Sequence, residues 1–492
     1  MLSRRLSILS RRFSTTAAGA KCNVAIVGSG PSAYYCADFL LKGDPDVHVD
    51  LYEQLPVPFG LVRYGVAPDH QTVKNVTERF GQISSDPRCN LLANVRIGPA
   101  SDSRWPEAAS LPLSDLRAQY DAVVLAYGAD NDRTLGVPGE ELGGVHGARQ
   151  FVEWYNGHPD AVERDFHLKS TETAVIVGHG NVALDCARML CATPEQLVGS
   201  TDVAAHAAAK LSESGVRQVV LLGRRGVLHA AFTIKELREL SKLAGSELKL
   251  VAPADAFNKT VMAAAKADRP RKRLIELMEK MPLVEETPVP VPAGAGSDKD
   301  ICVQFQRVPV GFVGGEDGRI SAVTLQKTAL EGAPSAKQQA SLIEGSEYNL
   351  PCQLALRAVG YRSSPLEGAP FDDKRGIIPS ANGGRVEDPS GAPLYVTGWL
   401  KRGPSGVILT NVTDAEETAK ALLSDKADGK LGGGGGGGGE AVREALSTQG
   451  KPVLGFDDWL KIDKVEVERG AAVGKVREKI VVKQEMIRTA GG

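Results

Sequence analysis

The sequence predicts an α/β protein with two three-layer domains, the second inserted into the first. Two stretches, 22–41 and 173–185, carry this prediction, because each runs from a short apolar segment through a glycine-rich turn into a helical pattern. Further strand-like segments at 350–362 and 393–399 indicate that the chain then returns to the first domain. The expected divisions are 22–130, 131–349 and 350–492.

The first glycine-rich turn has the residue types that a dinucleotide pyrophosphate requires. Gly28 permits a tight turn, Gly30 lets the backbone approach the phosphates, and Ala33 is small enough for the helix to pack on its strand. The helix N-terminus then faces the pyrophosphate charge. Glu53 ends the next strand-like segment, where a carboxylate accepts hydrogen bonds from ribose hydroxyls and repels a 2′-phosphate. This Rossmann-like, dinucleotide-binding pattern suits FAD or NAD rather than NADP.

A long segment rich in Pro and Gly, 54–70, follows Glu53. Its composition predicts a structured loop without a helix, at the edge of the sheet where such domains bind ligands, and we expect it to lie over the flavin. His70 is its most interesting titratable group. The sequence leaves two roles open for this histidine: moving protons near the flavin, or making a structural hydrogen bond.

The second glycine-rich turn repeats the first, with Gly178, Gly180 and Ala183. The strand that follows ends in Arg224 and Arg225 instead of an acid. Each guanidinium can hold a 2′-phosphate through charge-assisted hydrogen bonds worth about 1.5–3 kcal/mol. The pair therefore predicts a preference for NADPH over NADH of about two to four orders of magnitude. A solvated surface pair is the alternative.

Basic residues follow on two segments with helical patterns. We expect them to form one positive face that attracts an acidic protein partner, more weakly as salt rises. Ordinary solvated helices are the alternative. The residues are Lys235, Arg238, Arg271, Lys272 and Arg273.

The returning part of the chain carries a third glycine-rich stretch. Trp399 follows a strand and is expected to pack beside the flavin or the nicotinamide. A helix that starts near Gly406 would aim its N-terminal amides at the pyrimidine edge of the flavin. The glycine run 432–439 is expected to be a surface linker, and the segment beyond it to pack back on the surface.

Composition excludes several classes of protein. The 58 basic and 60 acidic side chains give a net charge of −2, which gives no reason to expect nucleic-acid binding. The apolar runs are far shorter than a membrane span, so no transmembrane segment is expected. The seven cysteines form no Cys-x-x-Cys pair and no cluster spacing, so we expect neither a redox-active disulfide nor a bound metal.

Residues 1–21 contain four serines, five basic residues and no acid. This composition is typical of an organelle transit peptide, and its arginines favour the mitochondrion over the plastid. The basic residues are Arg4, Arg5, Arg11, Arg12 and Lys21.

Four stretches are similar to one family, the mitochondrial adrenodoxin-type ferredoxin–NADP reductases. They are 55–70, 180–185, 223–239 with its Gly-Arg-Arg-Gly, and 398–408 with Gly-Trp-Leu-Lys-Arg-Gly-Pro-Ser-Gly-Val-Ile. The resemblance spans nearly the whole chain after residue 21. The chain departs from the family pattern at Ser32-Ala33, at His179 and in the glycine run.

The resemblance implies the site residues. Implied FAD contacts are Ser32, Glu53, Leu61, Ile97, Trp399, Gly406, Val407 and Ile408. Implied NADP contacts are His179, Gly180, Asn181, Val182, Arg224, Arg225, Glu236 and Gly406. The candidate catalytic residues are His70, Asp185 and Trp399.

The resemblance and the two nucleotide patterns lead to one hypothesis. NADPH passes a hydride to N5 of FAD, and the reduced flavin passes single electrons to a separate acidic [2Fe-2S] ferredoxin on the basic face. We expect a monomer in a transient complex, in the mitochondrial matrix or on the matrix side of the inner membrane. Two alternatives stay open: the NADPH-oxidising flavin subunit of a glutamate-synthase-like assembly, and a non-catalytic nucleotide-sensing protein.

Overall fold

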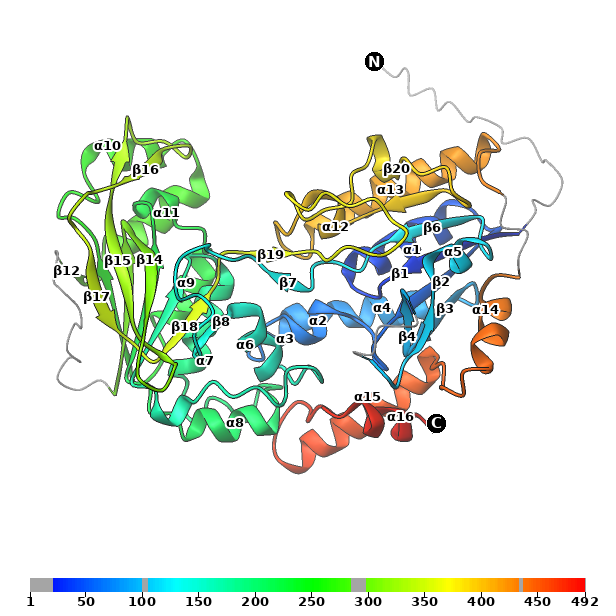
Figure 1. Cartoon of the computed structure of the whole chain (residues 1–492), viewed down its shortest axis with the longest axis horizontal. Coiled ribbons are helices and arrows are strands. Elements are labelled where there is room, and N and C mark those ends of the chain that lie inside the picture. The colour runs from blue at the N-terminus through cyan, green and yellow to red at the C-terminus, as the bar shows by residue number, and fades with distance from the viewer. Residues whose placement is uncertain (1–20, 100–104, 285–297, 433–436, 492) are drawn as a thin grey trace, which may run out of the picture.

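The computed structural model describes residues 21–99, 105–284, 298–432 and 437–491. The expected transit peptide therefore lies almost wholly outside the described residues. Figure 1 shows two lobes, each built on its own sheet, with the C-terminal helices beneath both. None of the helices described here is long and apolar enough to cross a membrane.

The first lobe is built on a six-stranded sheet in which β1 pairs with β2 and β6 in parallel. The late strand β21 pairs with β6 in parallel, so the returning chain completes this sheet. Helix α13 (Thr410–Ala427) packs on α1 (Pro31–Gly43). The strand order is β20 (Arg385–Val386), β21 (Leu394–Val396), β6 (Ala122–Leu125), β1 (Cys22–Val27), β2 (Val47–Glu53), β3 (Cys89–Ala93).

The second lobe is built on a seven-stranded sheet in which every pair is parallel. Such a sheet is covered on both faces, which explains its continuous apolar strands. Helices α7 (Asn181–Cys191), α9 (Ile234–Leu240) and α11 (Arg269–Met278) follow its strands. The strand order is β12 (Leu283–Val284), β11 (Ser246–Val251), β13 (Lys299–Phe305), β10 (Gln218–Gly223), β9 (Thr173–Val177), β18 (Leu354–Arg357), β8 (Val145–Gly147).

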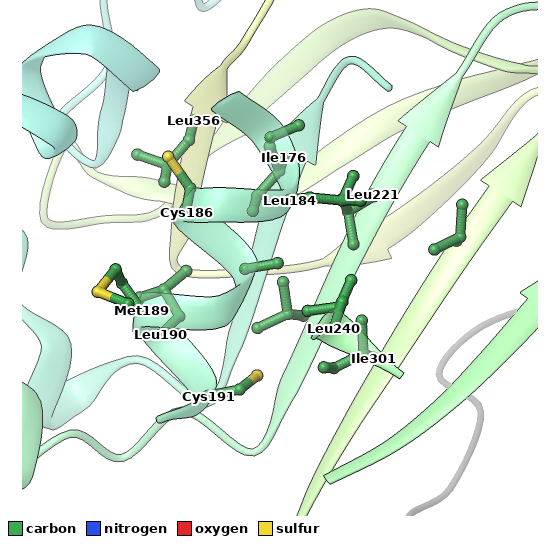
Figure 2. Close-up of a cluster of buried hydrophobic side chains, with 14 of the residues drawn as sticks. Ile176, Leu184, Cys186, Met189, Leu190, Cys191, Leu221, Leu240, Ile301 and Leu356 are labelled. Atoms are coloured by element: carbon green, nitrogen blue, oxygen red, sulfur yellow. The ribbon is translucent and has the colours of Figure 1, made fainter. Parts of the chain in front are cut away.

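The core of the second lobe shows where the insertion ends. Figure 2 shows Leu184 of α7 beside Ile176 of β9, with Leu190 of α7 and Leu356 of β18 in the same buried cluster. Strand β18 pairs with β9 on one side and β8 on the other. The expected return to the first domain at 350 is therefore wrong, because the last central strand of the second sheet still lies beyond that residue.

The remaining elements complete the two lobes. An antiparallel group extends the second lobe: β14 (Arg307–Gly314), β15 (Ile320–Glu331), β16 (Gln339–Leu342) and β17 (Tyr348–Pro351). The other strands are β4 (Val95–Ile97), β5 (Ala109–Leu111), β7 (Asn131–Asp132) and β19 (Tyr361–Arg362). The other helices are α3 (Gln71–Lys74), α4 (Val76–Ser84), α5 (Leu113–Arg117), α6 (Ala148–Tyr155), α8 (Ala205–Ser212), α10 (Lys259–Ala265) and α12 (Trp399–Arg402), with 3₁₀ turns at Leu168–Ser170, Val227–His229 and Asn382–Gly384.

The composition of the segment after Glu53 predicts a loop without a helix, and this prediction is wrong in part. It contains the one-turn helix α2 (Leu61–Tyr64). Gly60, whose φ is 48°, lets the chain turn sharply into this helix. A single helical turn fits between the glycines at 60 and 65, which is too short to leave a periodic pattern in the sequence.

The end of the glycine run is helical, which corrects the prediction of a surface linker over 432–439. Helix α14 (Gly438–Ser447) begins within the run. The amide N–H of Gly439 donates to Oδ2 of Asp50 at 2.9 Å, and a Cβ on this glycine would lie 2.7 Å from the same oxygen. Gly439 is therefore required because a side chain at this position would collide with Asp50.

The C-terminal helices α15 (Phe456–Ala472) and α16 (Lys483–Ala490) pack back on the first lobe, and each buries one face against its core. Trp459 is buried, and its ring packs edge-to-face with Phe59, with the two ring centroids 5.6 Å apart. Glu466 is fully buried and accepts both guanidinium N–H groups of Arg63, at 2.9 and 2.5 Å.

A buried charged cluster connects the C-terminal segment to both lobes. Asp202 of the second lobe pairs with Lys74 of the first lobe at 2.6 Å and with Lys479 at 3.0 Å. The two ammonium groups hold the pKa of Asp202 far below its usual range, although burial alone would raise it. Nearby, Lys483 pairs with Glu107 at 2.9 Å and with Asp160 at 2.6 Å. The C-terminal segment therefore fixes the orientation of one lobe relative to the other.

Candidate nucleotide and electron-transfer site

The first glycine-rich turn has the geometry of a phosphate cradle. Gly28 has φ 113°, and a Cβ on it would lie 2.5 Å from the carbonyl oxygen of Ala126, so only glycine fits. A Cβ on Gly30 would have no neighbouring atom within 4 Å. The bare backbone at the start of α1 thus faces open space, which fits the pyrophosphate of FAD.

Glu53 lies at the end of β2, beside this turn. Its Oε2 accepts from the Ser29 hydroxyl at 2.6 Å, and its Oε1 accepts from the Leu55 N–H at 3.0 Å. Burial raises the pKa of this carboxyl, although these hydrogen bonds oppose the rise. Ionised carboxylate oxygens each accept more than one hydrogen bond, so Glu53 retains acceptors for ribose hydroxyls.

The second turn has the same geometry as the first. Gly178 has φ 135°, and a Cβ on it would lie 2.3 Å from the carbonyl oxygen of Ala358. Gly180 faces open space, as Gly30 does, and α7 begins at Asn181 with Val182 next. The structure thus presents two equivalent phosphate cradles, one in each lobe.

His179 is turned away from the open side of the second cradle. Its Nε2–H donates to the Leu221 carbonyl at 3.3 Å, and its ring meets Phe305 edge-on at 4.8 Å. Burial lowers the pKa of His179 to about 4, so the ring is neutral at physiological pH. Its ring is therefore occupied within the protein, and only its backbone is left to contact a ligand in the cradle.

Arg224 and Arg225 come directly after β10, whereas Glu53 is the last residue of β2. Among the residues that the structure describes, no acidic side chain pairs with either guanidinium. The pKa of Arg225 is lowered by burial and by repulsion from Arg224 and Arg271. Arg271, which we predicted for the partner face, thus also contributes to this cluster of cations. A 2′-phosphate would relieve their mutual repulsion.

The candidate catalytic residues His70 and Asp185 meet in an ionic cluster between the lobes. Arg188 on α7 is its centre: its guanidinium bonds Asp69 at 2.5 Å, Asp185 at 2.7 Å and Glu236 at 3.3 Å. His70 Nε2 lies 2.8 Å from Oε2 of Glu239 and 3.1 Å from Nη2 of Arg188.

The predictions missed Arg188, Asp69 and Glu239, although the sequence held a partial signal. Asp185 and Arg188, like Glu236 and Glu239, are three residues apart on a helix and so share one face. His70, Glu236 and Glu239 offer ligand atoms within 4.8 Å of one another, but Arg188 already supplies positive charge to these carboxylates.

Burial sets the protonation of this cluster. It raises the pKa of Asp185 to about 6, against the opposing charge of Arg188. It also raises the pKa of Glu236, helped by the negative charge of Asp185. Burial therefore favours the protonated form of these two carboxyl groups more than solvent does.

Trp399 begins α12, and its indole N–H donates to the Ser405 carbonyl at 3.1 Å. Its ring meets Tyr361 at 5.5 Å. Helix α13 begins at Thr410, so the expected helix start near Gly406 is wrong. Gly406 has φ 81°, which no right-handed helix allows, and Val407 and Ile408 form the turn that enters α13.

The remaining predicted residues lie in their expected lobes. Ser32 is on α1, where a Cβ on Gly398 would come within 2.5 Å of its hydroxyl. Leu61 is the first residue of α2, and Ile97 ends β4 with its side chain in the core. All seven cysteines are buried free thiols.

The predicted partner face spans two adjacent helices, α9 and α11. Lys235 and Arg238 are exposed on α9, and Arg273 is exposed on α11. Two members also form loose pairs within their own helices, Lys235 with Glu239 at 3.7 Å and Lys272 with Glu276 at 3.5 Å.

The comparisons with known proteins agree with this geometry. The chain matches the pyridine nucleotide-disulphide oxidoreductase family over residues 22–240. It is 44% identical to human mitochondrial NADPH:adrenodoxin oxidoreductase, over 95% of this chain and 92% of that protein. The chain belongs to the NADPH:adrenodoxin oxidoreductase family.

A second relative and a solved structure extend the likeness. The mitochondrial protein of Arabidopsis thaliana is 40% identical over 98% of each chain. The structure of Mycobacterium tuberculosis FprA in complex with NADPH is 35% identical and superposes with a TM-score of 0.84, covering 96% of this chain and all of that one. The predicted family and the predicted fold of two Rossmann-like domains are confirmed.

Proposed function

We propose that this protein is a flavoprotein oxidoreductase that transfers electrons from NADPH to a mitochondrial [2Fe-2S] ferredoxin. The observation that supports it best is the opposite charge at the carboxyl ends of two corresponding strands: Glu53 at the end of β2, and Arg224 with Arg225 directly after β10. An acid suits an unphosphorylated ribose, and two guanidiniums suit a 2′-phosphate. The family name and the NADPH complex of FprA support the same assignment.

Each lobe then holds one cofactor. FAD is assigned to 22–130 and to the chain beyond β18, and NADP(H) to the segment between them. When bound, FAD takes two electrons from NADPH as a hydride and releases them singly. The backbone amides at Gly30 and Gly180 hold the two pyrophosphates, while Glu53, Arg224 and Arg225 select the riboses. The implied ligand residues on α1, α2, β4 and the Trp399–Ile408 segment complete the flavin site.

The role proposed for His70 is to hold a proton between the two cofactors. Protonated, its Nε2–H donates to Glu239; deprotonated, the same nitrogen accepts from Arg188. Both states therefore have a hydrogen-bond partner at Nε2. Asp185 and Glu236, whose pKa values are raised, provide further proton acceptors beside it.

The proposed partner is an acidic ferredoxin that docks on Lys235, Arg238, Arg271, Lys272 and Arg273. The exposure of α9 and α11 supports this face, because long cations on a free surface steer an anionic protein before contact. We propose a monomer in a transient complex. The names of the relatives and the composition of residues 1–21 support a mitochondrial location, in the matrix or on the matrix side of the inner membrane.

Stopped-flow reduction of the yellow holoprotein tests this function. We expect NADPH to bleach the flavin band at least 100-fold more efficiently than NADH, by the charge-assisted hydrogen bonds of two guanidiniums, each worth about 1.5–3 kcal/mol. Equal rates with both coenzymes would refute the assignment of the arginines. A colourless protein would favour the nucleotide sensor.

Reduction of cytochrome c tests the acceptor. We expect it to require added [2Fe-2S] ferredoxin and to slow as salt rises, because the proposed docking is electrostatic. A rate that is independent of ferredoxin would remove this partner and favour transfer within a larger assembly, as in glutamate-synthase-like enzymes.

A further inference from the structure

The turn Gly403–Leu409 carries residues assigned to both cofactors, and of its three large hydrophobic side chains only Ile408 packs against the core. It joins α12 to α13 on the side of the first lobe that faces the second (Figure 1). Val407 is 57% exposed and Leu409 is 72% exposed. A segment with so few buried apolar contacts opens easily unless polar contacts hold it.

One side chain makes most of the polar contacts that close this turn. The guanidinium of Arg402 donates to the Ser405 carbonyl, to the Asn411 side-chain oxygen at 2.7 Å and to the Thr410 hydroxyl at 3.1 Å. Arg402 thus spans the turn from its first half to the first residues of α13. Thr410 in turn fixes the position of Val407, because its hydroxyl donates to the Val407 carbonyl at 2.6 Å.

Helix α12, which carries Arg402, is itself held in place. Asp414 on α13 accepts from the Gly398 N–H and pairs with Lys401 at 2.9 Å, which fixes both ends of α12. The carbonyl of Ser405 also accepts the Trp399 indole N–H at 3.1 Å. Trp399 and Arg402 therefore close the turn on one shared acceptor.

We infer that Arg402 is a positioning residue: its planar, multiply bonded guanidinium holds the turn Gly403–Leu409 in the conformation that a bound flavin and nicotinamide would require. Arg402 acts through Ser405, Thr410 and Asn411. The inference rests on the proposed function only where it assigns this turn to the flavin and the nicotinamide. A lysine cannot replace the fork, because its ammonium is a point charge that reaches one acceptor well.

The test compares Arg402→Met and Arg402→Lys with Arg385→Met. Arg385 is a matched control, since it also pairs with α13, at Asp425 (2.6 Å), but far from the turn. At saturating NADPH we expect Arg402→Met to reduce its flavin at least about tenfold more slowly than the parent, since small misplacements cost up to 100-fold. Arg402→Lys should recover only part of the loss, and Arg385→Met should stay within twofold.

A second readout separates this inference from the proposed function. The visible circular dichroism of bound flavin reports the turn even if NADPH is not the donor, and we expect it to change in both Arg402 variants and not in Arg385→Met. Unchanged dichroism with parental reduction rates would overturn the inference. Equal slowing in Arg385→Met, with an equal loss of Tm, would reduce Arg402 to a structural residue. If Arg402→Met does not fold, the flavin reduction rate and dichroism of Arg402→Lys decide whether the inference holds. A parent that NADPH cannot reduce would refute the proposed function alone.

Discussion

Removing Arg224 and Arg225 together gives the sharpest prediction for this protein. Each guanidinium is expected to contribute about 1.5–3 kcal/mol to holding a 2′-phosphate, so the pair supplies about 3–6 kcal/mol. That free energy corresponds to about two to four orders of magnitude in the preference for NADPH. Arg225 should contribute the larger part, because Arg224 is exposed and its charge is screened more by solvent.

The assay is the dissociation constant for NADPH and for NADH, taken from the dependence of flavin reduction on coenzyme concentration. Arg224→Ala/Arg225→Ala should weaken NADPH binding by at least 100-fold, on the charge-assisted bond energies above, and leave NADH binding within about threefold. Arg217→Ala is the control, since Arg217 is exposed at the opposite end of the same strand, β10. A double variant that still prefers NADPH more than tenfold would show that another group reads the 2′-phosphate.

Three further outcomes follow from the structure. Burial raises the pKa of Asp185 to about 6, so this group stabilises the fold most below its ordinary pKa and loses that contribution as pH rises through 6. Between pH 5 and 7, the Tm of Asp185→Asn should therefore fall less than the Tm of the parent. Lys479→Met should lower the free energy of unfolding in urea by about 3 kcal/mol, since it removes one partner of buried Asp202. A change below about 1 kcal/mol would contradict the role of the C-terminal segment in holding the two lobes together. Arg238→Glu should raise the Kd for an acidic ferredoxin at low salt without altering reduction by NADPH, and a Kd that is insensitive to both charge and salt would exclude this face.

Part of the site could be predicted from residue types alone. Gly28 and Gly178 are required because their turns have positive φ and touch a neighbouring carbonyl, and such constraints leave glycine in the sequence. Under the proposed function, the choice of Glu53 in one lobe and Arg224 in the other follows from the charge of the ribose substituent. These are local requirements, so the sequence shows them directly.

The helix starts show where local reasoning fails. The glycines at 403 and 406 both take positive φ, which delays α13 to Thr410. Gly438 also has positive φ, yet α14 begins there, and Asp50 accepts the amide N–H of the next residue, Gly439. The same residue type thus ends one element and begins another, and the difference comes from a partner far along the chain.

The sequence by itself determined that two dinucleotide turns exist, which ribose each one suits, and that the chain returns to its first sheet. Only the tertiary structure decided that β18 belongs to the second sheet, that Arg188 joins His70 to Asp185, and that Lys479 clamps Asp202. The physical reason is range: turn requirements, caps and pairs within one helix act over a few residues, whereas strand pairing and ion pairs between distant segments act through space and leave no spacing in the sequence.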